Sequence, residues 1–122
     1  MKRRHNYKEL LVWKKARIFV NEIYIVTKNF PKDEIFCLTQ QMRRAAISIP
    51  SNIAEGYGRG TDAQILHFLD IAQGSAFEIE TQIYLAFDQK YLNDQICENL
   101  SQSIKEVIRM IESLQISFDK KG

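Results

Sequence analysis

Residues 39–69 read TQQMRRAAISIPSNIAEGYGRGTDAQILHFL, and this stretch decides the fold because it joins two helical patterns through one glycine-rich segment. Apolar residues recur at helical spacing over 39–55, with Pro50 inside as a kink or local break. The GYGRG run at 56–60 predicts a turn. A Thr-x-x-Gln capping box then opens a helix over 61–90. The stretch therefore predicts two successive helices.

Two further helices flank this pair. The first is expected over 7–29, and it ends before Pro31 because proline disfavours helical geometry in the residue that precedes it. The last is expected over 95–118, with Asn93 or Asp94 as its N-terminal cap. Each helix has an apolar face that can contribute to one core.

The composition agrees with a few long helices. Only 5 Gly and 2 Pro interrupt the 122 residues, which are 45% hydrophobic. We predict an all-α, antiparallel up-and-down four-helix bundle that forms one domain over 1–122, with 1–6 as a basic tail. No apolar run approaches the ~18 residues of a membrane span, so we expect a soluble, cytoplasmic protein without membrane contact. The 2 cysteines lie far apart and are expected to be thiols.

The formal net charge of +2 hides an opposition between the two halves. Residues 1–60 contain 12 Lys and Arg against 5 Asp and Glu, a charge of +7, whereas residues 61–122 contain 5 against 10, a charge of −5. Such asymmetry is typical of proteins with an anionic partner. It is equally compatible with two halves that neutralise each other within the bundle.

A second apolar stripe distinguishes the helix 7–29 from the others. Leu11, Ile18 and Ile25 recur every seven residues, on the opposite side from the main apolar arc. Because a helix within a monomeric bundle buries only one face, the stripe predicts a subunit contact in a homo-oligomer. The alternative is a set of scattered surface residues.

The sequence contains no pattern that indicates catalysis, a metal or a cofactor. His5 precedes the first helix, and Gln64 stands where a Glu-x-x-His motif around His67 would need glutamate. The glycine-rich segment lacks the Gly-Lys-Ser/Thr ending of a phosphate-binding loop. We expect a protein that is not an enzyme and has no cofactor.

A polar row on the helix 39–55 has two possible meanings. Arg44, Asn52 and Glu55 align along one side and, together with Arg59, are predicted to form a structural network of paired, buried charges. The alternative is a binding site on the same face.

The N-terminal segment is rich in basic residues, with Glu9 as its one acid. Aromatic Tyr7 and Trp13 lie among them, and Lys or Arg beside stacking aromatics is typical of RNA-binding surfaces. The alternative is a solvated tail with Trp13 in the core. The predicted nucleic-acid-binding residues are Lys2, Arg3, Arg4, Lys8, Lys14, Lys15 and Arg17.

Several segments resemble one known family. They include the run 12–16 (VWKKA), the run 38–46 (LTQQMRRAA) and the run 48–56 (SIPSNIAEG). Together they resemble the four-helix-bundle proteins encoded in intervening sequences of bacterial 23S ribosomal RNA. The resemblance implies a ring-like homopentamer and no settled activity.

A related branch comprises the accessory variability proteins of diversity-generating retroelements, which are basic platforms for a reverse transcriptase and its template RNA. Two functions follow from the sequence. The first is a homo-oligomer that binds structured RNA through its basic N-terminal half. The alternative is a scaffold or accessory subunit that docks a protein partner, for example a reverse transcriptase, without contacting nucleic acid.

Overall fold

The structure, a computed structural model, describes residues 6–121, and all of its regular elements are helical. Four α-helices and two short 3-10 helices account for nearly all of these residues. In chain order they are η1 (Tyr7–Glu9), α1 (Leu11–Thr27), η2 (Lys32–Glu34), α2 (Leu38–Arg59), α3 (Asp62–Asp88) and α4 (Asp94–Lys121). The all-α prediction with four main helices is confirmed.

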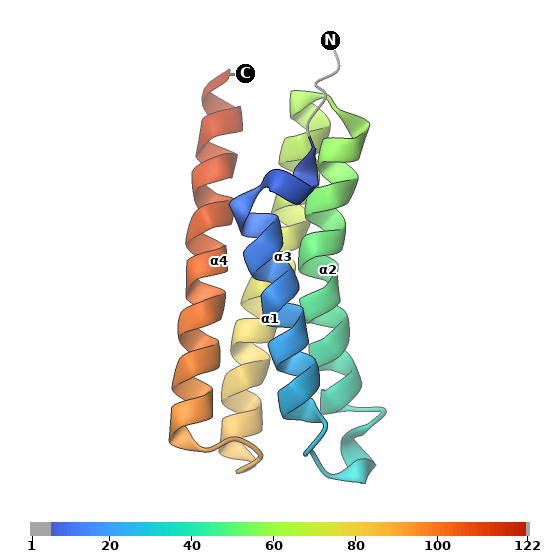
Figure 1. Cartoon of the computed structure of the whole chain (residues 1–122), viewed down its shortest axis with the longest axis vertical. Helices are drawn as coiled ribbons and strands as arrows, with labels where there is room; N and C mark the ends of the chain where they lie inside the picture. Colours follow the sequence, from blue (N-terminus) through green and yellow to red (C-terminus); the bar gives the residue numbers. More distant parts are fainter. Residues whose placement is uncertain (1–5, 122) are drawn as a thin grey trace.

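The helices pack around one core, with α1 and α3 diagonally opposite each other. Both α1 and α3 lie against α2 and α4, whereas within the described residues no close backbone approach links α1 to α3. Figure 1 shows the α1–α2 and α3–α4 connections at one end of the bundle, and the α2–α3 connection and the start of α1 at the other. The exposed surfaces of α1 and α3 therefore lie on opposite sides of the bundle.

The core is a continuous cluster of aliphatic and aromatic side chains from all four helices. Phe19, Met42, Ile79 and Ile104, one from each helix, are almost completely buried. Burying a side chain of this size stabilises the fold by roughly 1.5–3 kcal/mol. Within residues 6–121, no helix combines the length and apolar content needed to cross a membrane.

Residues 6–10 form a short 3-10 turn where the sequence predicted a continuous helix from residue 7. The Asn6 side chain accepts a hydrogen bond from the Lys8 amide at 3.1 Å, and Leu10 is extended with φ −67° and ψ 127°. This bend lets the Tyr7 ring pack edge-on against Trp13, with 5.3 Å between ring centroids. The predicted start was wrong because the extended backbone of Leu10 separates η1 from α1, which begins at Leu11.

The second helix is longer than predicted at its C-terminal end. It continues through Pro50 without the local break that was considered, and it includes Gly56 to Arg59, which were predicted as a turn. The helix ends at Gly60, whose φ of 82° is accessible to glycine at no steric cost. Of residues 56–60, only Gly60 lies outside the helix, in the turn that the sequence predicted for all five.

Gly56 has a different reason to be glycine. A Cβ atom there would lie 2.9 Å from the Cβ of Phe68 and 3.3 Å from the Cα of Ile65, both on α3. The missing side chain therefore allows α2 and α3 to approach closely beneath the connection between them.

The starts of the last two helices agree with the sequence prediction. The Thr61 hydroxyl accepts a hydrogen bond from the Gln64 amide at 3.2 Å, and the Asn93 side chain accepts one from the Ile96 amide at 2.8 Å. Both are N-terminal caps that satisfy otherwise unpaired backbone donors. The predicted helices 61–90 and 95–118 correspond to α3 and α4 to within three residues at each end.

Candidate nucleic-acid interface

The described part of the basic segment is the start of the chain up to the middle of α1. Lys8 belongs to η1, and Lys14 and Arg17 to α1; all three are exposed. Lys15, also in α1, is half-buried. The predicted residues Lys2, Arg3 and Arg4 lie outside the described residues.

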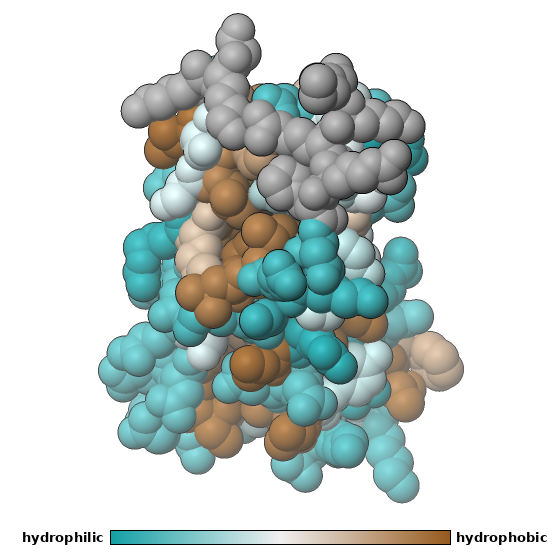
Figure 2. All heavy atoms as spheres, turned by 45° about the horizontal axis from the view of Figure 1, so that its top comes forward, coloured by the Kyte–Doolittle hydropathy of each residue, from teal (hydrophilic) through white to brown (hydrophobic). Residues whose placement is uncertain are grey.

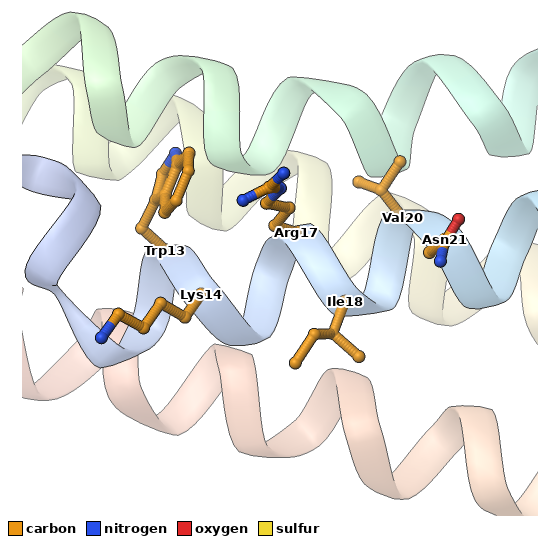
Figure 3. A pocket seen from close by; sticks show the side chains of 6 residues that line it. All are labelled: Trp13, Lys14, Arg17, Ile18, Val20 and Asn21. Atoms are coloured by element: carbon orange, nitrogen blue, oxygen red, sulfur yellow. The ribbon is translucent and has the colours of Figure 1, made fainter.

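A cleft opens between the start of α1 and the middle of α2. We call it the Trp13 cleft; its volume is about 330 Å³, and it is lined by Tyr7, Trp13, Arg17, Val20, Ile47, Pro50, Ser51 and Ala54. A shallow hollow of about 680 Å³ along α1 adjoins it and shares Trp13, Arg17 and Val20. Figure 3 shows these three side chains on the side of α1 that faces α2, with Ile18 on the side that faces α4.

Aromatic and basic groups contact each other at the mouth of the cleft. The guanidinium carbon of Arg17 lies 5.6 Å from the centroid of the Trp13 ring, and the ammonium of Lys8 lies 6.0 Å from the Tyr7 centroid. Both distances are within the range of cation–π attraction. Trp13 also packs partly against the core. The indole is thus fixed on one side and accessible from the cleft on the other.

The charged side chains that line the cleft and the adjoining hollow are, within the described residues, all positive. Among residues 6–121, no Asp or Glu lines either of them, whereas Arg17 lines both and Lys14 lines the hollow. Lys15 differs, because it forms an ion pair with Glu106 of α4. The hydrogen bond and the positive charge of Lys15 lower the pKa of Glu106 below its ordinary value of 4.5. Of the described basic residues in this segment, Lys8, Lys14 and Arg17 therefore have charges that no carboxylate offsets directly.

The stripe predicted on the first helix is exposed in the single protomer. Residues that form a subunit contact must be exposed in this way before assembly. Ile18 is 63% exposed, and Leu11 and Ile25 are 58% exposed. We call these three residues the α1 stripe. Figure 2 shows hydrophobic patches among hydrophilic side chains on the face that includes α1.

The sequence analysis missed a second exposed apolar surface, on α3. We call it the α3 stripe; its residues are Ile71, Phe77, Tyr84 and Leu85. The same helix contains five acidic residues and no Lys or Arg; the acids are Asp62, Asp70, Glu78, Glu80 and Asp88. The sequence does contain a signal for this surface, because the apolar arc of this helix is wider than one buried face requires. The α1 and α3 stripes lie on diagonally opposite helices.

The predicted network of buried charges on α2 is wrong. Arg44 and Glu55 are both exposed, and Glu55 forms an ion pair with Arg59 at 3.1 Å on the surface of the same helix. Asn52 does join a network, but a neutral one: its amide donates to the carbonyl and hydroxyl oxygens of Ser48, each at 2.8 Å. The Ser75 hydroxyl of α3 donates to the Ser48 hydroxyl at 2.8 Å. Two serines and one asparagine therefore connect α2 to α3.

The histidine of α3, which the sequence analysis considered as a metal ligand, lies on the surface. His67 is exposed and packs edge-on against Phe68, with ring centroids 5.0 Å apart. Over residues 6–121, no three His, Cys, Asp or Glu side chains cluster as a metal site would require.

Comparison with known proteins supports the family resemblance. The sequence pattern of the family described as 23S rRNA-intervening sequence protein matches residues 8–113. A crystal structure of a protein of unknown function, from the S23 ribosomal protein family of Bacteroides thetaiotaomicron, is similar with a TM-score of 0.80 and 24% sequence identity. The match covers 86% of this chain and 95% of that chain, and at this identity it shows the fold alone.

No curated protein matches the sequence at a significant level. The resemblance to accessory variability proteins of diversity-generating retroelements stays a prediction, since neither the family match nor the similar structure bears on it.

Proposed function

Because the chain belongs to the family of 23S rRNA-intervening sequence proteins, we propose that it is a non-enzymatic, homo-oligomeric protein of the cytoplasm that binds structured RNA through the start of α1. One observation carries this proposal. Lys8 lies beside Tyr7 and Arg17 lies over Trp13, while Lys14 lines the adjoining hollow, and within the described residues neither the cleft nor the hollow has an acidic lining. Cations that contact phosphates, beside aromatics that can stack on bases, form a typical RNA-binding surface.

The acidic second half of the sequence does not cancel this surface. Its negative charge is most concentrated on α3, which lies diagonally across the bundle from α1. Lys15, paired with Glu106 of α4, is the described basic residue of the segment whose charge is offset within the protomer. The asymmetry between the two halves of the sequence therefore corresponds to a separation in space, and an anionic partner is attracted to one side.

The same separation favours assembly of identical protomers. The α1 stripe lies on a helix with three basic residues and one acid, Glu22, whereas the α3 stripe lies on a helix with five acids and no base. Each apolar stripe thus lies on a helix of opposite net charge to the other. We expect the α1 stripe to pack against the α3 stripe of a neighbour, because a stripe packed against a copy of itself would bring like charges together. Such a contact is head to tail, and it closes into a ring when the rotation between neighbours permits.

The ring-like homopentamer implied by the family resemblance is a closed form of this contact. The positions of the helix connections in Figure 1 support the antiparallel up-and-down path that places the two stripes on opposite sides. Assembly would also multiply the RNA-binding surfaces, because each protomer contributes one to the same ring. Several weak sites then act together on one RNA.

The direct test is the affinity for a structured RNA at low salt. We expect Lys8→Gln, Lys14→Gln and Arg17→Gln, combined in one variant, to weaken binding of a fluorescent RNA hairpin strongly, measured by anisotropy. The matched control replaces Lys28, Lys32 and Lys90 with Gln, which removes the same charge at the opposite end of the bundle. Equal loss in the two variants would show that net charge, not this surface, governs binding.

A second candidate function has one observation in its favour. Phe36 is 82% exposed and Ile35 is 53% exposed, both in the connection between η2 and α2. Large apolar side chains at such a position fit a scaffold that docks a protein partner, such as a reverse transcriptase. Absence of hairpin binding by the wild-type protein at low salt would favour this candidate over RNA binding.

A further inference from the structure

We propose that the Trp13 cleft binds one unpaired nucleobase of the RNA, stacked on the Trp13 indole, while the Arg17 guanidinium moves from the ring to the adjoining phosphate. This inference rests on the proposed function, because it specifies which part of an RNA the basic surface recognises. It predicts a preference for loops and bulges over continuous duplex, since paired bases cannot leave their stack without cost.

Two neighbouring side chains determine how a flat ligand could approach the Trp13 ring. Tyr7 packs against the indole at an interplanar angle of 72°, so it contacts the ring edge-on and does not stack on it. Arg17 lies over the ring at 5.6 Å from its centroid. The side chain of Arg17 is exposed, and within the described residues it forms no ion pair. Its hold on the indole is therefore weak enough for a base to replace it.

The opposite wall of the cleft comes from α2 and suits a base. Ile47, Pro50 and Ala54 present apolar surface, and Ser51 is exposed with a hydroxyl that can donate or accept a hydrogen bond at a base edge. The volume of about 330 Å³ lies at the lower end of the range of about 300–1,000 Å³ that small-ligand sites span. An apolar slot with one adaptable polar group accepts any base with little sequence preference.

The charge at the mouth of the cleft identifies the ligand as nucleic acid and not as an apolar peptide. Lys14 lines the adjoining hollow, and Lys8 contacts Tyr7 at the edge of the cleft. A nucleotide has an aromatic base joined to an anionic phosphate, and the cleft offers an aromatic surface with cations beside it. The complementarity therefore extends over both parts of one nucleotide.

The cleft and the α1 stripe lie on different sides of α1, although Ile18 lines the adjoining hollow together with Trp13 and Arg17. Figure 3 shows Trp13 and Arg17 on the α2 side of α1 and Ile18 of the α1 stripe on the α4 side. A neighbouring protomer on the stripe and a base in the cleft thus approach α1 from different sides.

Trp13 is the one tryptophan of the sequence, so its fluorescence reports on this site alone when tyrosine is not excited. We expect a hairpin with an unpaired loop to quench the emission of the wild-type protein. A blunt duplex of equal charge is expected to bind through its phosphates and to change the emission much less, because no base stacks on the indole. Anisotropy of labelled RNA measures binding independently of Trp13.

Removing Trp13 risks the fold because the ring packs partly against the core, so the decisive variant is Ser51→Leu, which narrows the cleft from an exposed position. It is expected to weaken loop-RNA binding roughly fivefold to a hundredfold, the usual effect of losing one stacked base, with duplex binding unchanged. The control is Ser117→Leu, the same replacement at an exposed position of α4 outside the cleft.

Two results would overturn the inference in different ways. Loop RNA that binds by anisotropy without changing Trp13 emission, or that binds Ser51→Leu as tightly as Ser117→Leu, excludes the base site and leaves RNA binding intact. Absence of any binding by the wild-type protein at low salt excludes the base site together with the proposed function.

Discussion

At the scale of single residues, Gly56 and Gly58 differ although they lie two positions apart in α2. A Cβ atom at Gly56 would collide with Phe68, whereas a Cβ atom at Gly58 would meet nothing within 4 Å. The first glycine is needed for close packing against α3. The second increases the conformational freedom of the unfolded chain and has no packing role.

We therefore expect opposite effects from the same substitution. Gly56→Ala should lower the free energy of unfolding by about 1–3 kcal/mol, because the helices must separate to admit a methyl group. Gly58→Ala should raise it by about 0.5–1 kcal/mol, because alanine is the better helix former at an unobstructed position. Urea denaturation of the two variants measures both effects. A loss of stability in Gly58→Ala equal to that in Gly56→Ala would contradict the assignment of close packing to Gly56.

Residue-level roles were predicted unevenly from the sequence. The caps Thr61 and Asn93 were predicted because capping depends on neighbours within one turn. Arg44 and Glu55 were misjudged because helical spacing shows that residues share a face but not how deeply that face is buried. The Ser48 hydroxyl accepts a hydrogen bond from Ser75 of α3. Helical spacing within α2 could not identify a partner on another helix.

At the scale of elements, α1 is joined to α4 by the ion pair between Lys15 and Glu106. Lys15 lowers the pKa of Glu106 in the folded state. The pair therefore stabilises the fold above the unfolded pKa of Glu106, and this contribution is lost as the pH falls through the lower, folded value. Because both groups are partly solvated, the effect is expected to be small.

The expected result is a difference in melting temperature that depends on pH. Lys15→Gln should melt below the wild type at neutral pH, and the two should converge as the pH falls below the ordinary carboxyl range, where Glu106 becomes protonated. Lys14→Gln, one residue away and without an ion pair to the described residues, is the control. A difference between Lys15→Gln and the wild type that persisted undiminished at low pH would exclude Glu106 as the partner.

Element boundaries show where sequence patterns reach their limit. The end of α1 at Thr27 was predicted to within two residues from the position of Pro31, since a helix is expected to end before a proline. The extended Leu10, which separates η1 from α1 beside the contact between the rings of Tyr7 and Trp13, was not predicted. The cleft beside that contact could not be foreseen either, since Pro50 and Ser51 of α2 form its other wall.

At the scale of the whole molecule, the proposed assembly depends on two exposed apolar stripes of one protomer, which we expect to pack against each other. The α1 stripe predicted from heptad spacing is exposed, and the α3 stripe lies on the diagonally opposite, acidic helix. A head-to-tail contact uses both stripes once in each protomer, whereas a two-fold contact uses one stripe twice. Variants of each stripe distinguish these arrangements.

Ile18→Glu and Phe77→Glu are each expected to produce monomers in sedimentation velocity, because both residues are exposed and their loss leaves the core intact. An equimolar mixture should form dimers and nothing larger, since the intact α3 stripe of one variant meets the intact α1 stripe of the other. Monomers alone in the mixture, or an unaffected oligomer in Phe77→Glu, would show that α1 does not pair with α3.

RNA binding through the start of α1 is tested most directly by the salt dependence of the affinity for one RNA hairpin. Each phosphate contact contributes roughly 0.7–0.9 to the slope of log affinity against log salt. The variant with Gln at Lys8, Lys14 and Arg17 should therefore flatten the slope by roughly 2–3 in every protomer that contacts the RNA. The variant with Gln at Lys28, Lys32 and Lys90 should keep the wild-type slope. Equal slopes for all three proteins, or no wild-type affinity at low salt, would contradict RNA binding at this surface.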